Sequence, residues 1–351
     1  MKTMRGPGLF ISQFIGDAPP FDSLEGMAGF AAGLGFKALQ IPVHDRRFVD
    51  LDRLGEAGYV EAVMAVLERA GMVVSEISAA RAGALLAVHP AYDDVMDVFA
   101  RTADRGNPAA RQARAAADLH AAIGLAARSG AGRLGVFSGG LAWPYFYPYP
   151  PAPPGLVDRA FDELARRWRP ILDAADAQDV DVCFELHPGQ DLHDGATFER
   201  FLALVDRHPR ARVLYDPSHM LLQQMDYLGF IDRYHARIGA FHVKDAEFRR
   251  SASRGVYGGY GEWIDRPGRF RSLGDGQIDF HGIFDRLTEY GFDGWAVLEW
   301  ECCLKNAMDG AAEGARFIDG HITRVAERAF DAGMRGAAPP EVLDRMLGLR
   351  R

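Results

Sequence analysis

The chain has 351 residues, of which 48% are hydrophobic and 25% are charged, a composition typical of a globular protein with a large core. Its 48 acidic and 40 basic residues give a net charge of −8, which argues against a broad nucleic-acid-binding surface. No apolar run approaches the roughly 20 residues that a membrane span needs, and the N-terminus has no signal-peptide pattern. The three cysteines form no disulfide framework. We therefore expect a cytoplasmic protein without a nucleic-acid or membrane partner.

Short apolar or aromatic runs alternate with helical stretches eight times along the chain. The expected strands are Leu9–Phe14, Ala38–Val43, Val73–Ala79, Arg133–Phe137, Val182–His187, Val213–Asp216, Ile238–Asp245 and Gly294–Glu301. The expected helices lie near Ser23–Leu34 and Gly55–Ala70, in two stretches that end at Ser129 and Gln178, and near Gly195–Arg207, Asp226–His235, Phe280–Tyr290 and Met308–Ala329.

This alternation implies parallel strands with right-handed crossovers, and eight such units favour one closed (β/α)8 barrel, an α/β fold. No Gly-x-Gly-x-x-Gly turn follows the first strand, so a dinucleotide-binding fold has little support. We expect the barrel to cover residues 1–330, with a long loop between the seventh strand and its helix. Residues 331–351 are expected to form a C-terminal tail packed on the barrel.

The last four expected strands each end in a residue that can bind a metal, namely Glu185, Asp216, His242 and Glu299. Because the C-terminal ends of barrel strands converge on one pocket, we expect these side chains to meet. Three carboxylates buried together would repel one another, and one divalent cation neutralises most of that charge. Such ligands suit Mn²⁺ or Mg²⁺ best, with Co²⁺ and Zn²⁺ as alternatives. A single acidic residue at a strand end is more often a helix cap or a solvated loop residue, but four in succession are hard to reach by chance.

Strand alternation places further polar side chains beside this group. His187, Lys244 and Glu301 lie on the same strand faces as three of the four residues, and we expect them to contact a substrate. His187 and His219 could contact the substrate or orient the ligands through hydrogen bonds. Lys244 could instead form a salt bridge with Asp245.

Residues 247–276 form a loop of a length that is typical of functional segments. Its arginines flank an aromatic, glycine-rich stretch, Tyr257–Trp263. These arginines are Arg249, Arg250, Arg254, Arg269 and Arg271. The loop could be a lid, bind an anionic sugar through residues such as Arg271, lie free in solvent or contact another subunit. Together with the aromatic residues of Tyr145–Tyr149, it would suit the interface of a homodimer or homotetramer.

Four strand-end motifs stand out in order along the chain: Phe184–Glu185–Leu186–His187–Pro188, Tyr215–Asp216–Pro217–Ser218–His219, Phe241–His242–Val243–Lys244–Asp245 and Val297–Leu298–Glu299. They resemble the motifs of the xylose isomerase-like barrel superfamily, in its branch of sugar phosphate isomerases and epimerases, and the resemblance runs from about residue 8 to 330. It implies that Glu185, Asp216, His242 and Glu299 hold the metal and that His219 contacts the sugar. In the ketose 3-epimerases of this family the two ligand glutamates also move the proton, so Glu185 and Glu299 are the expected catalytic residues.

Two departures from the epimerase pattern leave the reaction open. Phe248 stands where those enzymes usually have an arginine six residues after the metal-binding histidine. Lys244, in a His-Val-Lys-Asp run, is similar to the inosose dehydratases, in which a basic group beside the metal can assist loss of water. We therefore expect a divalent-metal-dependent isomerase or epimerase of a keto-sugar that works through an enediolate. The alternative is a metal-dependent dehydratase, a lyase, of a keto-cyclitol or keto-sugar.

Two other functions have less support. An abasic-site endonuclease, the nucleic-acid enzyme of the superfamily, would carry an Asp-x-His pair where this chain has Gly268–Arg269–Phe270. A non-catalytic carbohydrate-binding barrel would need a vestigial metal site, yet all four expected ligands are present.

Overall fold

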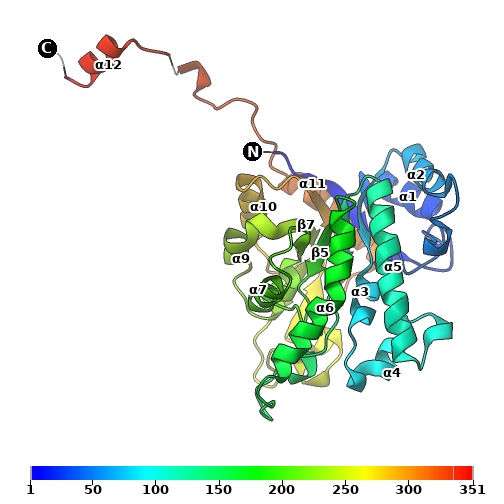
Figure 1. Ribbon diagram of the computed structural model, residues 1–351. Helices are drawn as coiled ribbons and strands as arrows, with labels where there is room; N and C mark the ends of the chain where they lie inside the picture. Colours follow the sequence, from blue (N-terminus) through cyan, green and yellow to red (C-terminus); the bar gives the residue numbers. More distant parts are fainter. Residues whose placement is uncertain (1, 335, 350–351) are drawn as a thin grey trace.

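The computed structural model describes residues 2–334 and 336–349, in which eight parallel strands close into a barrel (Figure 1). The strands are β1 (Arg5–Phe10), β2 (Ala38–Pro42), β3 (Val73–Ser78), β4 (Arg133–Val136), β5 (Asp181–Glu185), β6 (Ala211–Tyr215), β7 (Ile238–Val243) and β10 (Trp295–Leu298). Their order around the barrel is β1-β10-β7-β6-β5-β4-β3-β2, so consecutive units are neighbours and β10 closes the ring against β1. The expected (β/α)8 barrel is confirmed.

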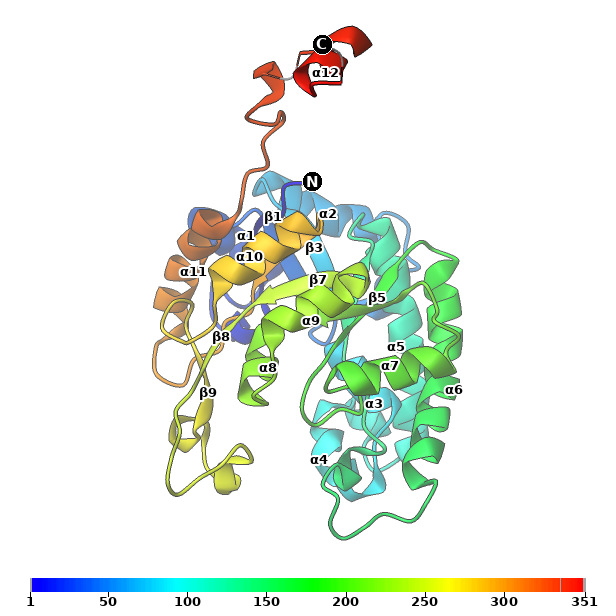
Figure 2. The same cartoon turned by 90° about the vertical axis from the view of Figure 1, so that its left-hand side faces the viewer.

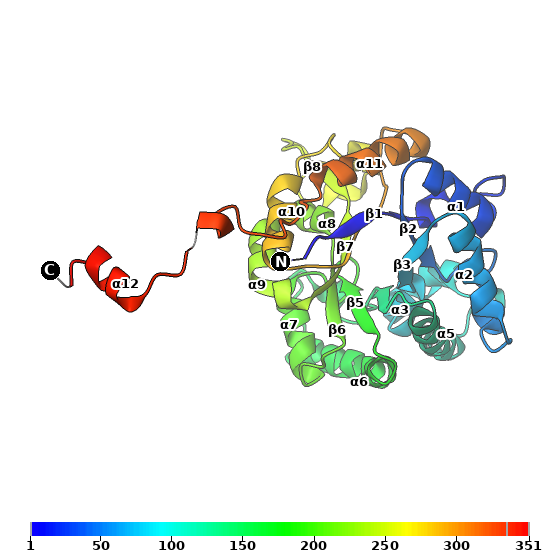
Figure 3. The ribbon, with the colours of Figure 1, turned by 90° about the horizontal axis from the view of Figure 1, so that it is seen from above.

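Helices cover the outside of the barrel (Figure 2 and Figure 3). They are α1 (Leu24–Gly33), α2 (Tyr59–Arg69), α5 (Pro108–Arg128), α6 (Leu156–Asp176), α7 (Gly195–Leu204), α9 (Tyr227–Tyr234), α10 (Phe280–Glu289) and α11 (Ala307–His321). Most begin after a short polar residue whose side chain accepts a backbone N–H of the first turn, which satisfies a donor that the helix itself leaves free. These capping residues are Ser23, Asn107, Asp194, Asp226, Asp279 and Asn306. None of the helices in the described ranges has the length and apolarity that crossing a bilayer requires.

The core between strands and helices is aromatic on the side of β5. Trp168 of α6 packs edge-on against Phe184 of β5, with 4.7 Å between ring centroids, and Phe184 packs against Phe201 of α7 at 5.2 Å. The indole N–H of the fully buried Trp168 donates to the carbonyl oxygen of Ser138 at 2.9 Å. Burying each such side chain contributes about 1.5–3 kcal/mol. This packing fixes β5, whose last residue is Glu185, against the helical layer.

Glu76 of β3 is a buried polar side chain in the barrel. It is only 1% exposed, and neither of its carboxylate oxygens accepts a hydrogen bond from the described residues. Burial raises the pKa of Glu76, because a low-dielectric environment disfavours the ionised form. A neutral carboxyl group therefore fits this position better than a carboxylate does.

The chain between β7 and α10 leaves the barrel as an antiparallel ribbon (Figure 2). Its strands are β8 (Asp245–Phe248) and β9 (Gly268–Arg271). Arg269 and Arg271 both pair with the carboxylate of Glu247, at 2.7 and 2.9 Å. Arg254 and Arg266 donate to backbone carbonyl oxygens near the tip of the ribbon. Several arginines of the expected loop thus bind partners inside the ribbon itself.

Asp245 holds the base of this ribbon. Its carboxylate accepts the backbone N–H groups of Ala246, Gly274, Gly276 and Ile278, at 2.8, 3.0, 2.9 and 3.3 Å. A side chain at Gly276 could not be accommodated, because its Cβ would lie 2.1 Å from a carboxylate oxygen of Asp245. Asp245 is therefore occupied by backbone donors, and the alternative in which it pairs with Lys244 is not what the structure shows.

The C-terminal tail extends away from the barrel (Figure 1). Phe330, Met334 and Met346 are 96%, 82% and 76% exposed. The helix α12 (Pro340–Met346) has 7 residues and buries none of them. The described part of the tail thus does not pack on the barrel as expected, since so short a helix offers too little apolar surface to offset the entropy of ordering it.

Candidate metal centre

Four side chains at the C-terminal ends of neighbouring strands meet in one group. Glu185 ends β5, Asp216 follows β6, His242 lies in β7 and Glu299 follows β10. One ligand atom from each residue lies within 4.8 Å of the others, and all four residues are at most 6% exposed. The structure therefore brings together the residues expected to converge, and their role as metal ligands stays a prediction.

The electrostatics of this group fit a divalent cation. Burial, together with repulsion from Glu299, raises the pKa of Glu185, and burial raises the pKa of Asp216. Burial alone would lower the pKa of His242, but Glu299 and the other carboxylates outweigh it and raise that pKa to about 9. Asp216 Oδ2 is buried and accepts no hydrogen bond within the part of the chain that the structure describes. Three carboxylates and an imidazole, with one buried oxygen that accepts no hydrogen bond from the described residues, suit an ion that prefers oxygen ligands.

Two glutamines orient members of this group. Gln40 Oε1, from β2, lies 2.8 Å from His242 Nε2. Because an amide oxygen only accepts, Nε2 carries the proton, and Nδ1 faces Glu299 Oε2 at 2.8 Å. Gln13, just after β1, donates to Glu299 Oε1 at 2.9 Å. Sequence reasoning missed both glutamines, although a polar residue within the apolar strand Ala38–Pro42 was a signal for Gln40.

Lys244 places a buried positive charge beside the four residues. It is 2% exposed, and its Nζ lies 2.8 Å from Glu301 Oε2, 3.3 Å from Glu299 Oε2 and 3.8 Å from Asp216 Oδ2. The ammonium also lies over the ring of Phe270, 4.3 Å from its centroid. Burial alone would lower the pKa of Lys244, but Glu299, Glu301 and Asp216 outweigh it and raise the pKa. Lys244 is therefore charged at neutral pH.

Two histidines lie against the same group. The rings of His187 and His219 are 4.1 Å apart, and His219 Nε2 is 3.1 Å from Glu185 Oε1 and 3.4 Å from Asp216 Oδ2. Burial lowers the pKa of each histidine to about 4, so both are neutral at pH 7. The positions of His187, His219, Lys244 and Glu301 agree with the expected cluster, while their contact with a substrate stays a prediction.

Arg271 differs from the other expected substrate contacts. It follows Phe270, which faces Lys244, and neighbouring residues of a strand point to opposite faces. The guanidinium of Arg271 pairs with Glu247 at 2.9 Å, and no contact joins it to the four-residue group in the ranges that the structure covers. The structure thus places Arg271 in the ribbon, paired with Glu247, and its expected contact with a substrate stays a prediction.

Aromatic side chains connect two segments of the barrel rim. Tyr257 of the ribbon contacts Phe146 and Tyr147 of the segment after β4, with ring centroids 5.9 and 5.8 Å apart. In the barrel, β5 and β6 lie between β4 and β7, so this contact spans the side that carries Glu185 and Asp216. The three rings remain about half exposed, at 48% to 61%. The expectation that this surface forms a homo-oligomer interface stays a prediction.

Comparisons with known proteins agree with this architecture. The sequence model of the family described as "Xylose isomerase-like TIM barrel" matches residues 29–321. The inosose dehydratase of Serratia proteamaculans (strain 568) is 27% identical over 172 residues, which cover 47% of this chain and 56% of that enzyme. The chain therefore spans little more than half the length of this curated relative.

Two solved structures share the fold over most of their length. An L-ribulose 3-epimerase superposes with a TM-score of 0.60 and 18% identity, covering 92% of this chain and 94% of the epimerase. The probable 3-DHS dehydratase AsbF of Bacillus anthracis also gives a TM-score of 0.60 and 18% identity, covering 91% of this chain and 99% of AsbF. At this level of identity the likeness shows the fold alone.

Proposed function

The chain belongs to the xylose isomerase-like TIM barrel family, and we propose that within it the chain is a divalent-metal-dependent lyase that removes water from a keto-cyclitol or keto-sugar. The observation that carries this proposal is the buried ammonium of Lys244, which lies 2.8 Å from Glu301 and 3.3 Å from Glu299. Similarity to an inosose dehydratase supports the same reaction class. The dehydratase, expected from the sequence as the alternative, thus becomes the leading proposal.

The four-residue group would hold the metal. A divalent ion bound by Glu185, Asp216, His242 and Glu299 would act as a Lewis acid toward the ketone oxygen of the substrate. Gln40 and Gln13 fix which atoms of His242 and Glu299 face that position.

Loss of water from a hydroxy-ketone needs a base and an acid. Glu185 is the better base of the two glutamates. Burial and the charge of Glu299 raise the pKa of Glu185. Burial would also raise the pKa of Glu299, but the charges of Lys244 and His242 have the larger effect and lower it. Glu185 would remove the proton on the carbon next to the ketone. The neutral His219, whose Nε2 lies 3.1 Å from Glu185 Oε1, would hold that carboxyl group in position.

Lys244 would supply the acid. As the carbon–oxygen bond breaks, its electron pair leaves with the hydroxyl oxygen, which takes a proton from Lys244 Nζ and departs as water. A carbon–carbon double bond forms beside the ketone, and no oxidant or reductant is required. Glu301, whose side chain is 39% exposed, connects Nζ to solvent and would help return the proton to it.

A metal-dependent epimerase is the second candidate, because two glutamates lie in the same group. Glu185 and Glu299 could act on opposite faces of one carbon, one removing a proton and the other returning it. No carbon–oxygen bond would break in that reaction, so the charged Lys244 would have no leaving group to protonate. An abasic-site endonuclease has less support, since Phe270 packs against Lys244 and His219 where those enzymes carry a metal-binding histidine.

Reaction in D₂O distinguishes these functions. We would incubate manganese-loaded protein with inosose and with ketohexoses and follow the products by NMR and mass spectrometry. Loss of one water is expected for the lyase, while deuterium at a retained carbon without loss of water would establish the epimerase instead. Metal-stripped protein is the control. Manganese and sugar binding without either reaction would show a non-catalytic barrel.

A further inference from the structure

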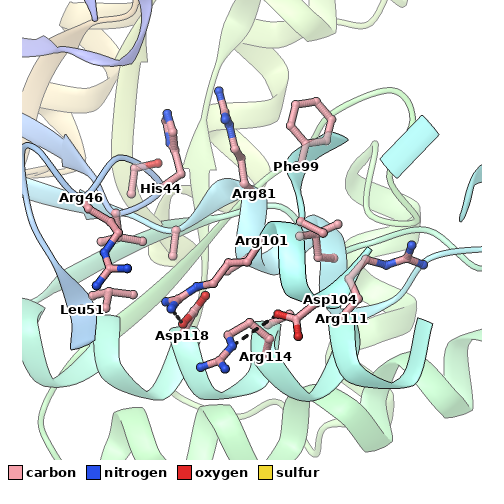
Figure 4. A pocket seen from close by; sticks show the side chains of 17 residues that line it. His44, Arg46, Leu51, Arg81, Phe99, Arg101, Asp104, Arg111, Arg114 and Asp118 are labelled. Atoms are coloured by element: carbon pink, nitrogen blue, oxygen red, sulfur yellow. Dashed lines mark hydrogen bonds and ion pairs between the residues drawn. The ribbon is translucent and has the colours of Figure 1, made fainter. Parts of the chain in front are cut away.

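A cavity of about 240 Å³ lies at the barrel rim beside the ends of β2 and β3, against α5 and the short helix α3 (Ala80–Leu86) (Figure 4). More arginines than carboxylates line this cavity. The arginines are Arg46, Arg81, Arg101, Arg111 and Arg114, and the carboxylates are Asp104 and Asp118. A cavity with this lining has the character of a site for an anionic group, provided that its cations are not already neutralised.

Most of these arginines have carboxylate partners. The pairs are Arg46 with Asp50, Arg101 with Asp118, Arg111 with Asp97 and Arg114 with Asp104. Arg81 is the exception, because no carboxylate of the described residues lies in ion-pair contact with it. The neighbouring Asp45 is occupied by Arg47, at 2.6 Å. Arg81 thus has no ion-pair partner among the described residues, and the carboxylate charge that acts on it, from a greater distance, is that of Asp45.

Two neighbours of Arg81 complete an open recognition surface. Its guanidinium lies over the ring of Phe99, 5.2 Å from the centroid, which supports the side chain in place. Burial and the charge of Arg81 lower the pKa of His44 to about 4, so His44 is a neutral hydrogen-bonding group at pH 7. Figure 4 shows the side chains of His44, Arg81 and Phe99 pointing to the same side, away from α5.

This surface and the metal centre share one end of the barrel. His44 follows β2 and Arg81 follows β3, and the C-terminal ends of barrel strands open on one mouth. Gln40 of β2 contacts His242, and His44 is only four residues further along the chain. At roughly 3.3 Å per residue, the backbone positions of Gln40 and His44 are at most about 13 Å apart. His44 and Arg81 line the same cavity, so this cavity begins at the strand end that follows Gln40.

We propose that Arg81, with His44 and Phe99, binds the anionic group of the substrate, a carboxylate or a phosphate, while the ketone lies at the metal centre. The planar guanidinium matches both groups through two parallel N–H donors. In the ribbon, Arg254, Arg266, Arg269 and Arg271 already bind partners, so these four arginines are less available to an anion than Arg81 is. This inference rests on the proposed function and names its substrate class, a keto-sugar or keto-cyclitol that carries an acidic group.

Three related keto-sugars test the proposal by isothermal titration calorimetry on the manganese-loaded protein. The probes are 5-keto-D-gluconate, D-fructose 6-phosphate and neutral D-fructose. We expect at least one acidic sugar to bind tenfold or more tightly than D-fructose. A preference for the first probe identifies a carboxylate, and one for the second a phosphate. Arg81→Gln should abolish the preference, and Arg81→Lys should keep part of it, because lysine retains the charge without the fork of donors.

Arg69→Gln is the matched control, because Arg69 is a surface arginine of α2 that does not line the cavity. It should bind all three sugars like the wild type. Equal binding of acidic and neutral sugars by the wild type, or an unchanged preference in Arg81→Gln, would overturn the inference. Manganese affinity and thermal stability of Arg81→Gln should match the wild type, since Arg81 touches none of the four metal-centre residues. Absence of manganese binding by the wild type would instead contradict the proposed function.

Discussion

Lys244→Met removes the buried ammonium beside the metal centre and keeps most of the unbranched stem. Nζ lies 2.8 Å from Glu301, 3.3 Å from Glu299 and 3.8 Å from Asp216. With an effective dielectric constant of about 20, these distances correspond to attractions of about 6, 5 and 4 kcal/mol before the cost of desolvation. A third of the attraction to Glu299, which belongs to the metal-centre group, is about 1.7 kcal/mol, and this is enough to change an equilibrium constant more than tenfold. Because the ammonium and a divalent ion compete for the same carboxylates, we expect Lys244→Met to bind Mn²⁺ at least tenfold more tightly.

The same substitution should separate the two halves of the reaction. Without the acid that protonates the leaving hydroxyl, the rate of water loss is expected to fall by about 10²–10⁴-fold, which is about 2.7–5.4 kcal/mol of activation free energy. Removal of the proton next to the ketone depends on Glu185 and not on Lys244. Exchange of that proton with D₂O should therefore continue in the variant.

Calorimetric titration with Mn²⁺ and NMR of the substrate in D₂O measure both effects. Lys37→Met is the control, since Lys37 is an exposed lysine whose nearest carboxylate, of Asp319, is 3.9 Å away. It should leave manganese affinity and turnover unchanged. Undiminished water loss in Lys244→Met would refute the assignment of Lys244 as the acid, and weaker manganese binding would refute the competition between its ammonium and the metal ion.

Three further substitutions probe the centre and the barrel interior. Glu299→Gln removes one charge from the metal-centre group, so we expect turnover to disappear with an unchanged circular dichroism spectrum, and full activity would contradict its role. Gln40→Leu deprives His242 Nε2 of its acceptor and should weaken Mn²⁺ binding about 10–100-fold by calorimetry, whereas equal affinity would show that Gln40 does not orient the histidine. Burial raises the pKa of Glu76 above its value in the unfolded chain, so the unfolded chain ionises first and the wild type loses stability as the pH rises above about 4.5. Thermal denaturation should therefore find Glu76→Gln more stable than the wild type at pH 8 and nearly equal to it at pH 5, and a difference independent of pH would contradict this.

The four metal-centre residues could be predicted from the sequence because their proximity follows from topology alone. Parallel strands of a closed barrel deliver their last residues to one rim, so Glu185, Asp216, His242 and Glu299 had to meet once the eight units were recognised. Gln40 could not be assigned in this way. Its role depends on reaching across the barrel from β2 to His242, which is set by the packing of the interior and not by any local pattern.

The sequence also did not show which charged side chains form ion pairs with one another. The sequence shows that the segment 247–276 is rich in arginine, but not that Arg271 pairs with Glu247 while Arg81, elsewhere on the rim, has no carboxylate partner. Pairing depends on distances of a few ångströms between distant parts of the chain. The packing of the tail on the barrel could not be predicted for a related reason. The apolar side chains of residues 331–351 do not show whether the barrel offers a surface that would cover them.

The hydrogen bonds to Asp245 have a consequence for how this barrel can change over evolution. Because this carboxylate fastens residues 274–278 to the end of β7, the ribbon begins and ends at a fixed base. Loop-closure free energy grows slowly with length, by about 0.6 kcal/mol for each doubling. Residues 249–267 can therefore be lengthened, shortened or replaced with little disturbance of the barrel. Selectivity for new molecules can diverge in this segment while the reaction centre below it stays the same.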